Sequence, residues 1–558
     1  MRPLLPASIA ILALAATAQA HDRDDLGRLT PVVAPNPKVA GSAAPNVLSP
    51  ELVETIVAQG ANALENPAAV SLGNGKMLEI DHYGYNGNGP MLPTAGDVQA
   101  VGHNVEANKT EPDKNTYLVL HHQRGADPDY DYGTHFLFQG HETGATNAAG
   151  AVVGYITRIN LDADDLHRVT LMAALDTAGA TLPTFDGSTW DPWAQRLLFT
   201  SEAGSAGGVW QATLDFPSMA EDISGSFGRG GYEGIQNDSD GNVWIVEDSG
   251  GGTGAVNTHA KQPNSFLFRF VPRHLGNLRE GKLQALQLIS LRTHQPIAFH
   301  AGQADADILS PDVGDLHTYG KVFQTHWVTI HDTAVDGNVP FDANALAKAK
   351  LATPFKRPEN GQFQPGTGFR RFFFDETGDT DSRTEAGSAF GGFGSILVLN
   401  QSDPSAGSGT LTLFFRGDID HTGFDNVAFF GRDQVVFVED RGDGLHAQHN
   451  ALDSAFLFDT RLDYANPSHR PIRILAQGRD ASATLDSGFQ GTPGFPNEGD
   501  NELTGIHVSN GDPGRHGILG AQDPDLFDDG WRAFYTQQHG DNMTWEILPK
   551  GGSNRSDR

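Results

Sequence analysis

Val243-Trp-Ile-Val-Glu-Asp-Ser-Gly250 is an apolar run that ends in two acids and a turn, and the chain repeats this pattern. Similar stretches are Leu197-Leu-Phe-Thr-Ser-Glu-Ala-Gly204 and Val435-Val-Phe-Val-Glu-Asp-Arg-Gly442, with a fainter copy at Ala533-Phe-Tyr-Thr-Gln-Gln-His-Gly540. Repetition of one strand-and-turn pattern is typical of a repeat architecture such as a propeller. It also places carboxylates at the same end of successive strands, which favours a site for a hard cation.

Strand-like runs dominate the chain from about residue 70 onward. Examples are Thr116–Leu120, His135–Phe138, Ser395–Leu399 and Thr410–Phe415, all rich in β-branched and aromatic residues. Helical patterns are few, at Asp342–Lys350 and around Met219–Ile223. We therefore predict an all-β fold of radially repeated four-stranded blades, with loop and short-helix insertions.

Composition restricts the partners of this protein. The 558 residues include 69 acids and 38 Lys or Arg, a formal net charge of −31. Such a chain repels nucleic acids and anionic membranes, so we expect neither as a partner. The charge fits a cation-binding secreted protein, although solubility alone would also explain it. The absence of cysteine excludes disulfides, thiolate metal ligands and cysteine nucleophiles.

The first twenty residues resemble a cleavable secretory signal. Arg2 is followed by an apolar run over residues 9–16 and by the small-residue site Ala18-Gln-Ala20. The run is short for a membrane span, which disfavours an uncleaved anchor, and no later segment is apolar enough to cross a membrane. Without a twin-arginine pair, we expect Sec-type export to a secreted or periplasmic location.

The mature chain divides into three parts. Residues 21–69 are predicted to form an N-terminal arm with one short helix, because Ser49 is a candidate N-cap, Pro50 suits the first helical position and Gly60 would end the helix. Residues 70–548 hold the predicted propeller, and residues 549–558 are predicted to form a flexible tail.

Acids at strand ends are the candidate metal ligands. They are Glu142, Glu202, Glu233, Glu247, Asp248, Glu439, Asp440 and Glu502. In a propeller these strand ends face one end of a central channel, where several ionised carboxylates require a cation. Oxygen ligands favour Ca²⁺, and several ions are expected. For any one pair, a solvated turn or a hydrogen-bond acceptor is the alternative.

Two other acidic segments have simpler interpretations. Asn237-Asp-Ser-Asp-Gly-Asn242 lacks the spacing of an EF-hand loop and is better interpreted as a hairpin turn. Asp375-Glu-Thr-Gly-Asp-Thr-Asp381 is either a weak ion-binding loop or a solvated one. His141, beside an acid, is more typical of a hydrogen-bonded structural residue. We find no zinc spacing, nucleophile elbow or P-loop.

Arg357-Pro-Glu-Asn360 combines a bidentate anion binder with a carboxylate two residues later. In an extended segment, side chains two residues apart share one face. Arg357 could therefore hold a phosphate oxyanion while Glu359 reaches a metal ion. The alternative is a surface ion pair, which contributes little.

From about Tyr117 to His539, the chain resembles the PhoX-type alkaline phosphatases. The resemblance depends on an ordered series of motifs, each weak by itself. They are Phe138-Gln-Gly-His-Glu142, Asp186-Gly-Ser-Thr-Trp-Asp-Pro-Trp193, Leu198-Phe-Thr-Ser-Glu202, Tyr232-Glu-Gly234, Val246-Glu-Asp248, Phe266–Pro272, Arg357-Pro-Glu359, Phe424-Asp-Asn426, Glu439-Asp440, Glu502-Leu-Thr-Gly505 and Gln538-His539. The resemblance implies a six-bladed β-propeller with calcium and iron ions in its channel.

The resemblance also implies roles for individual residues. Glu233, Glu359 and Asn426 or its neighbour Asp425 would be metal ligands, and Arg357 would contact the phosphoryl group. Catalysis would then involve Arg357, Glu359 and Glu233, with His539 as a further substrate contact. The implied reaction is metal-assisted hydrolysis of a small phosphate ester.

Three departures from the family pattern affect the metal. The family's cysteine ligand corresponds to Ser201, its early asparagine corresponds to Gly140, and the twin-arginine signal is absent. All three point away from iron, so we predict a calcium-dependent phosphatase, with Fe³⁺ as the less favoured cofactor. The alternatives are a metal-dependent esterase or lactonase, and a non-catalytic, calcium-stabilised binding module.

Overall fold

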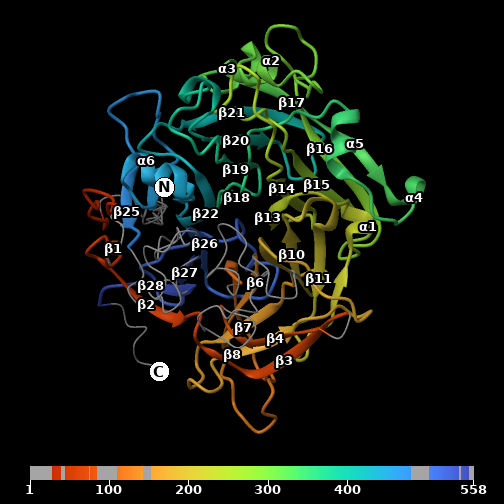
Figure 1. The fold of residues 1–558 in the computed structure, drawn as a ribbon, viewed down its shortest axis with the longest axis vertical. Coiled ribbons are helices and arrows are strands. Elements are labelled where there is room, and N and C mark those ends of the chain that lie inside the picture. The colour runs from red at the N-terminus through yellow and green to blue at the C-terminus, as the bar shows by residue number, and fades with distance from the viewer. Residues whose placement is uncertain are drawn as a thin grey trace, which may run out of the picture.

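The computed structural model describes residues 28–38, 44–73, 76–84, 110–142, 153–478, 502–538 and 542–551. The predicted signal peptide, His539 and residues 552–558 of the predicted tail lie outside the described residues. Antiparallel sheets make up most of the fold, and they lie around a common centre (Figure 1). The all-β prediction is confirmed, in a propeller-like arrangement.

Four separate sheets have four or five strands each. The first contains β5 (Pro112–Val119), β6 (His135–His141), β7 (Ile156–Asn160) and β8 (Val169–Ala173). The second contains β9 (Ser188–Asp191), β10 (Arg196–Ser201), β11 (Gly208–Ala212) and β12 (Ala220–Asp222). The third contains β22 (Phe424–Gly431), β23 (Gln434–Glu439), β24 (Ser454–Asp459), β25 (Ile472–Ala476) and β1 (Val47–Leu48). The fourth contains β26 (Leu503–Ser509), β27 (Arg532–Gln537), β28 (Met543–Pro549) and β2 (Leu52–Ala58).

A nine-stranded sheet occupies the remaining part of the ring, in the order β13-β14-β15-β16-β17-β21-β20-β19-β18. Its strands are β13 (Tyr232–Asn237), β14 (Val243–Glu247), β15 (Leu267–Pro272), β16 (Gly281–Leu288), β17 (Val322–Asp332), β18 (Gly361–Phe363), β19 (Arg371–Glu376), β20 (Ser395–Gln401) and β21 (Ser408–Arg416). The prediction of six separate blades is therefore wrong. The physical reason is that the long strand β17 pairs with both β16 and β21, which joins two four-stranded units edge to edge.

Aromatic packing holds the two halves of this large sheet together. Trp244 on β14 is buried, and its ring centroid lies 5.1 Å from Trp327 on β17 and 5.0 Å from Phe372 on β19. One apolar cluster thus extends from the first half to the second. Large aromatic side chains contribute much of the burial energy in such a core.

The first strand of each four-stranded unit lies nearest the centre. In ring order these strands are β5, β9, β13, β18, β22 and β26, and each contacts the next, with β26 contacting β5. The ring is therefore closed among the described residues. Residues that begin these strands, although far apart in sequence, can meet at one end of the ring.

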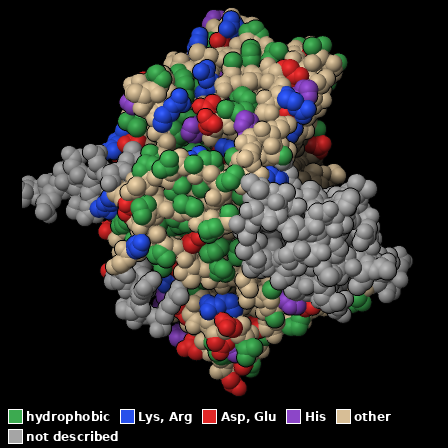
Figure 2. Space-filling model, turned by 60° about the vertical axis from the view of Figure 1, so that its left-hand side comes forward, with side chains coloured by type: hydrophobic (Ala, Val, Ile, Leu, Met, Phe, Trp, Pro, Cys, Tyr) green, Lys and Arg blue, Asp and Glu red, His purple; other side chains and the backbone are tan. Residues whose placement is uncertain are grey.

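The remaining elements lie outside this ring of first strands. The hairpin of β3 (Ala63–Gly73) and β4 (Lys76–His82) contacts β8. The short helices are α1 (Ser224–Phe227), α2 (Ala304–Ile308), α3 (Pro311–Leu316), α4 (Thr333–Asp336), α5 (Ala343–Ala349) and α6 (Gly442–His449). Among the described residues, none of these helices has the length and apolar character needed to cross a membrane. On the face drawn in Figure 2, acidic, basic and apolar side chains are interspersed.

Two predicted helices are wrong and one is confirmed. The segment from Ser49 to Gly60 contains the strand β2, and the Met219–Ile223 region contains β12. In β2, Leu52 is buried and the strand pairs with β28, so a tertiary partner overrides the local cap signals. The helix predicted over Asp342–Lys350 is α5, for which Asp342 is the N-cap.

The acidic turn between β13 and β14 is a hairpin, as predicted. Asp238 Oδ1 accepts hydrogen bonds from the backbone N–H groups of Asp240 and Asn242, at 2.9 and 3.0 Å. Its Oδ2 accepts from Trp244 Nε1 and from Asn242 Nδ2, each at 2.8 Å. Both carboxylate oxygens are thus used within the protein, which leaves this segment a structural role.

Burial raises the pKa of Asp238 from 3.8 to about 6, which gives a testable dependence of stability on pH. The folded state then binds this proton more tightly than the unfolded state does. Its stabilising contribution is complete below pH 3.8 and is lost as the pH rises through 6. Relative to Asp238→Asn, the free energy of unfolding of the wild type should fall by roughly 3 kcal/mol over this window, at about 1.4 kcal/mol per pKa unit. Denaturant titrations at several pH values measure this difference, and a constant difference would contradict the account.

Candidate metal centre

Three of the central strands begin with a carboxylate next to a β-bulge. The ladder register shifts after Pro112 in β5, after Tyr232 in β13 and after Phe424 in β22. The next residue in each strand is an acid, namely Asp113, Glu233 and Asp425. A bulge bends its strand and changes the direction of a side chain. In this fold it brings the three acids to one end of the ring.

Second strands supply acids at the same end. His141 at the end of β6 pairs with Pro112, and Glu247 at the end of β14 pairs with Tyr232. The residues that follow are Glu142 and Asp248, and Glu202 likewise follows β10. The repeated sequence pattern therefore places its last acid beside the acids of the first strands.

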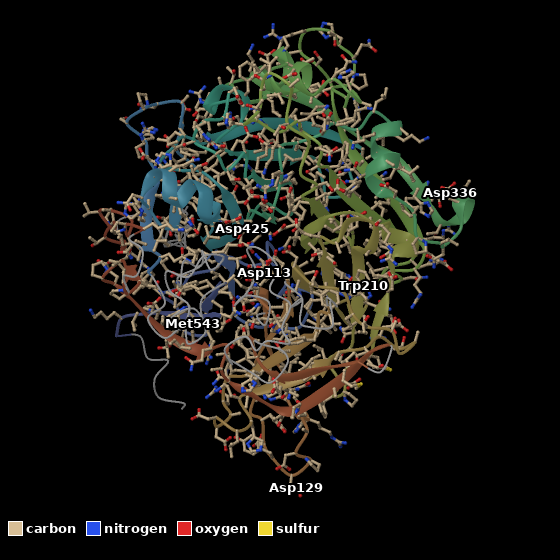
Figure 3. The ribbon with its side chains drawn as sticks, in the orientation of Figure 1. Asp113, Asp129, Trp210, Asp336, Asp425 and Met543 are labelled. Carbon is tan, nitrogen blue, oxygen red and sulfur yellow. The ribbon has the colours of Figure 1, made fainter. Side chains whose placement is uncertain are left out.

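Eight carboxylates form one continuous group, which we call the carboxylate cluster. Its members form four sets of three whose candidate ligand atoms lie within 4.8 Å of one another: Asp113, Asp186 and Glu233; Glu142, Asp186 and Glu202; Glu202, Asp248 and Glu359; Glu233, Glu359 and Asp425. Asp186, Glu202, Glu233 and Glu359 each belong to two sets. Asp113 and Asp425 lie near the middle of the ring (Figure 3).

In its ionised form the cluster would carry more negative charge than its neighbours Arg357 and Lys114 can balance. Burial, and then repulsion by neighbouring carboxylates, raises the pKa of Asp186 and Glu233 well above the ordinary range. Burial, followed by the charges of Asp248 and then Glu359, raises the pKa of Glu202 in the same way. Bound cations would remove this penalty and keep the carboxylates ionised.

Several carboxylate oxygens of the cluster have no hydrogen-bond partner. Among the described residues, these buried atoms are Asp186 Oδ1, Asp248 Oδ1 and Asp425 Oδ2. Buried polar atoms are normally paired, so a bound ion or water is the usual partner of such oxygens. The donors are carboxylate oxygens and no thiolate is present, a set that fits Ca²⁺.

Arg357 lies at the edge of the cluster. Its Nε donates to Asp248 Oδ2 at 2.8 Å, and its Nη2 forms ion pairs with Asp248 Oδ2 at 2.8 Å and with Glu359 Oε1 at 3.3 Å. Its backbone has a φ of 56°, which is uncommon for a side chain of this size. Such conformations persist where the surroundings over-determine them, often at functional sites. The sequence analysis placed Arg357 and Glu359 on one face, and the structure brings them together with Asp248.

Other predicted residues lie beside the cluster rather than in the four sets. Glu247 accepts from Asn344 Nδ2 at 2.9 Å and from the backbone of Phe266 at 3.1 Å, so it is a structural acceptor. Asp440 Oδ1 accepts from the Gly442 backbone at 2.9 Å. Burial, and then the charge of Asp440, raises the pKa of Glu502.

Asn426 holds a neighbouring acid in place. Its Nδ2 donates to Asp425 Oδ1 at 2.7 Å and to Thr504 Oγ1 at 3.0 Å. His141 bonds through its two ring nitrogens to Thr110 and Thr157, which matches the structural interpretation. His539 lies outside the described residues.

Sequence reasoning missed Asp113, Asp186 and Lys114. Lys114 is buried and donates to Asn426 Oδ1 at 2.8 Å and to the Ile506 carbonyl at 3.0 Å. Burial lowers its pKa to about 8, while the charges of Asp113 and Asp425 raise it. The signal for Asp113 was its place after Pro112 at a strand start, which matches Tyr232-Glu233 and Phe424-Asp425. Asp186 was visible only as the first residue of its Gly- and Trp-containing motif.

Comparisons with known proteins bear on this geometry. No protein-family model matches the chain, and no curated protein matches it in sequence. The structure of Pseudomonas fluorescens PhoX in complex with vanadate, a transition-state analogue, matches over 93% of this chain and 98% of its own, with a TM-score of 0.50 and 11% identity. The chain is similar in fold to PhoX. At this identity the likeness shows the fold alone.

Further solved structures match less closely. They include a Trichoderma reesei carbohydrate-active enzyme of family AA12, with a TM-score of 0.27 and 11% identity over 92% of this chain and 99% of that chain. A glucose dehydrogenase matches with a TM-score of 0.26 and 11% identity over 68% of this chain and 98% of that chain. These likenesses are too weak to contribute to the argument.

Proposed function

We propose that this protein is a secreted or periplasmic, calcium-dependent phosphatase that hydrolyses small phosphate esters. The observation that carries the proposal is the carboxylate cluster with Arg357 at its edge. An acidic protein can attract an anionic ester only where cations reverse the local field. The fold likeness to PhoX supports the same reaction class.

The acids that belong to two sets are proposed as the principal ligands of several calcium ions. They are Asp186, Glu202, Glu233 and Glu359, with Asp113, Glu142, Asp248 and Asp425 completing the sets. Bound calcium would stabilise the negative charge that develops on the phosphoryl oxygens. Calcium is preferred to iron because the site offers carboxylates and no thiolate. Stoichiometric iron in active protein, measured by elemental analysis, would overturn this assignment.

Within the chain, Arg357 is proposed to bind and orient the phosphoryl group. Asp248 and Glu359 hold two nitrogens of its guanidinium, and Nη1 has no partner among the described residues. This arrangement fixes the side chain and leaves a donor for an oxyanion. Asn426 and Lys114 act on the cluster indirectly. Asn426 bonds to Asp425, and Lys114 bonds to Asn426. They would hold Asp425 in position.

Substrate comparison tests the proposed reaction class. Purified mature protein in calcium buffer is expected to release the chromophore from a chromogenic phosphate monoester and to leave a γ-lactone intact. Selective opening of the lactone would favour the alternative esterase or lactonase. Turnover of neither substrate, in a protein that binds calcium, would favour the non-catalytic binding module.

A further inference from the structure

The loop over residues 249–264 begins and ends beside Arg357. Asp248, which immediately precedes the loop, accepts a hydrogen bond from Arg357 Nε and forms an ion pair with Nη2. At the other end, Ser265 and Phe355 form an isolated bridge two residues before Arg357. Both ends of the loop therefore lie beside the segment that carries Arg357.

Three carboxylates from outside this loop, one of them on α2, bind its backbone. Asp305 accepts from the backbone N–H groups of residues 255–257 at 2.8–3.0 Å. Glu385 accepts from residues 258 and 259 at 3.2 and 3.0 Å. Asp379 accepts from the backbone of Lys261 at 2.8 Å. The side chains of Asn257 and His259 also bond to Asp305 and Glu385, so the loop is tied to its neighbours through both backbone and side chains.

Asp379 also ties the backbone of Lys261 to the segment that carries Arg357. Its Oδ1 accepts from the Lys261 N–H, and its Oδ2 lies 3.1 Å from the buried Nζ of Lys356. Lys356 directly precedes Arg357. The Thr377 N–H, two residues before Asp379, donates to the Arg357 carbonyl at 2.8 Å, so the Asp379 segment links the backbone of Lys261 to that of Arg357.

The Lys261 ammonium is half-buried and has no hydrogen-bond or ion-pair partner among the described residues. Burial, and then the charge of Arg357, lowers the pKa of Lys261. The charges of Asp248, Asp379 and Glu359 raise it. A half-buried lysine without a partner among the described residues, on a loop that is tied to the Arg357 segment, is placed to receive an anion.

The charges already paired with Arg357 explain why a second cation, Lys261, would be needed to bind an anion. The guanidinium is already paired with Asp248 and Glu359, so it adds little net positive charge for an approaching dianion. We propose that Lys261 is a second anion-binding residue, which holds the phosphoryl group of the substrate together with Arg357. This inference rests on the proposed function and extends it to a substrate-positioning residue that the sequence analysis did not single out.

Replacement of Lys261 by methionine tests this role because the apolar stem is kept while the charge is removed. We expect KM for the phosphate monoester to rise about tenfold and kcat to change less than about twofold, as for loss of one charged hydrogen bond made equally in ground and transition states. Lys261→Arg should recover most of the loss. The control is Lys282→Met, since Lys282 is exposed and pairs with Asp332 at 3.5 Å.

Binding of inorganic phosphate separates this inference from the proposed function. Titration calorimetry on the calcium-loaded protein should show about tenfold weaker phosphate binding in Lys261→Met than in Lys282→Met, with equal melting temperatures. A wild type that binds phosphate but turns over no ester would overturn the phosphatase and leave Lys261 as an anion-binding residue. Equal phosphate affinity in both variants, or no phosphate binding by the wild type, would overturn the role of Lys261.

Discussion

Replacing Arg357 by alanine is expected to lower kcat/KM for a phosphate monoester by about 10³-fold, a loss typical of removing a donor that stabilises transition-state charge. Arg357 is held by Asp248 and Glu359 and keeps Nη1 without a partner among the described residues. Removal takes away both an oxyanion donor and the countercharge of two acids. Steady-state kinetics in calcium buffer measure the loss.

Matched variants show whether the loss is specific to Arg357. Arg292→Ala removes an exposed arginine that pairs with Asp315 at 2.7 Å and should leave turnover unchanged. Arg357→Lys keeps the charge without the planar fork, so we expect partial activity. If Arg357→Ala folds and retains turnover within about threefold of wild type, Arg357 does not bind the phosphoryl group.

Glu233→Gln is expected to reduce the stabilisation of the protein by calcium by about half or more, because a ligand that binds only the folded state raises its stability according to its affinity. Glu233 belongs to two of the four acid sets, and its loss affects both. The expected change in melting temperature, relative to the wild type, differs between calcium buffer and chelator. The variant should melt below the wild type in calcium and no lower than the wild type in chelator, since one repelling charge is gone. Thermal melts in calcium and in chelator measure both differences.

Glu247→Gln is the matched control for Glu233→Gln. Glu247 is buried and lies at the end of a strand of the same sheet, but it bonds to Asn344 and Phe266 rather than joining the cluster. Its replacement should lower the melting temperature equally in both buffers and leave the calcium-dependent shift intact. If Glu233→Gln and Glu247→Gln show the same calcium-dependent shift, the cluster does not bind calcium at Glu233.

Much of the fold was predictable because its signals are local and repeated. The runs that end at Glu247 and Glu439 are strands β14 and β23, and each lies beside a first strand of the ring. The failures involve pairing between distant segments. Local cap signals at Ser49 predicted a helix, but the segment pairs with β28 and forms strand β2. No local pattern shows that β17 pairs on both of its edges.

The sequence predicted those site acids that lie at the ends of strand-like runs. Glu142, Glu202, Glu233 and Asp248, predicted from strand ends, meet in the cluster with Glu359, predicted from the segment after Arg357, and Asp425, implied by the family resemblance. Asp113 was missed because its strand start resembles a loop until the bulge register is known, and Asp186 was missed because it precedes β9 in a loop. The pattern also gave Glu247 the same weight as Asp248, although alternation along an extended chain places the two side chains on opposite faces.

The most direct test of the central claim is hydrolysis of a chromogenic phosphate monoester by one preparation of mature protein, assayed in calcium, in chelator and with calcium restored. The account predicts turnover that is lost with the chelator and returns with calcium, while elemental analysis shows no stoichiometric iron. Turnover that persists in chelator at full calcium removal would contradict it. No turnover in any of the three buffers, together with a fall in melting temperature in chelator, would also contradict the account. Calcium would then have only a structural role.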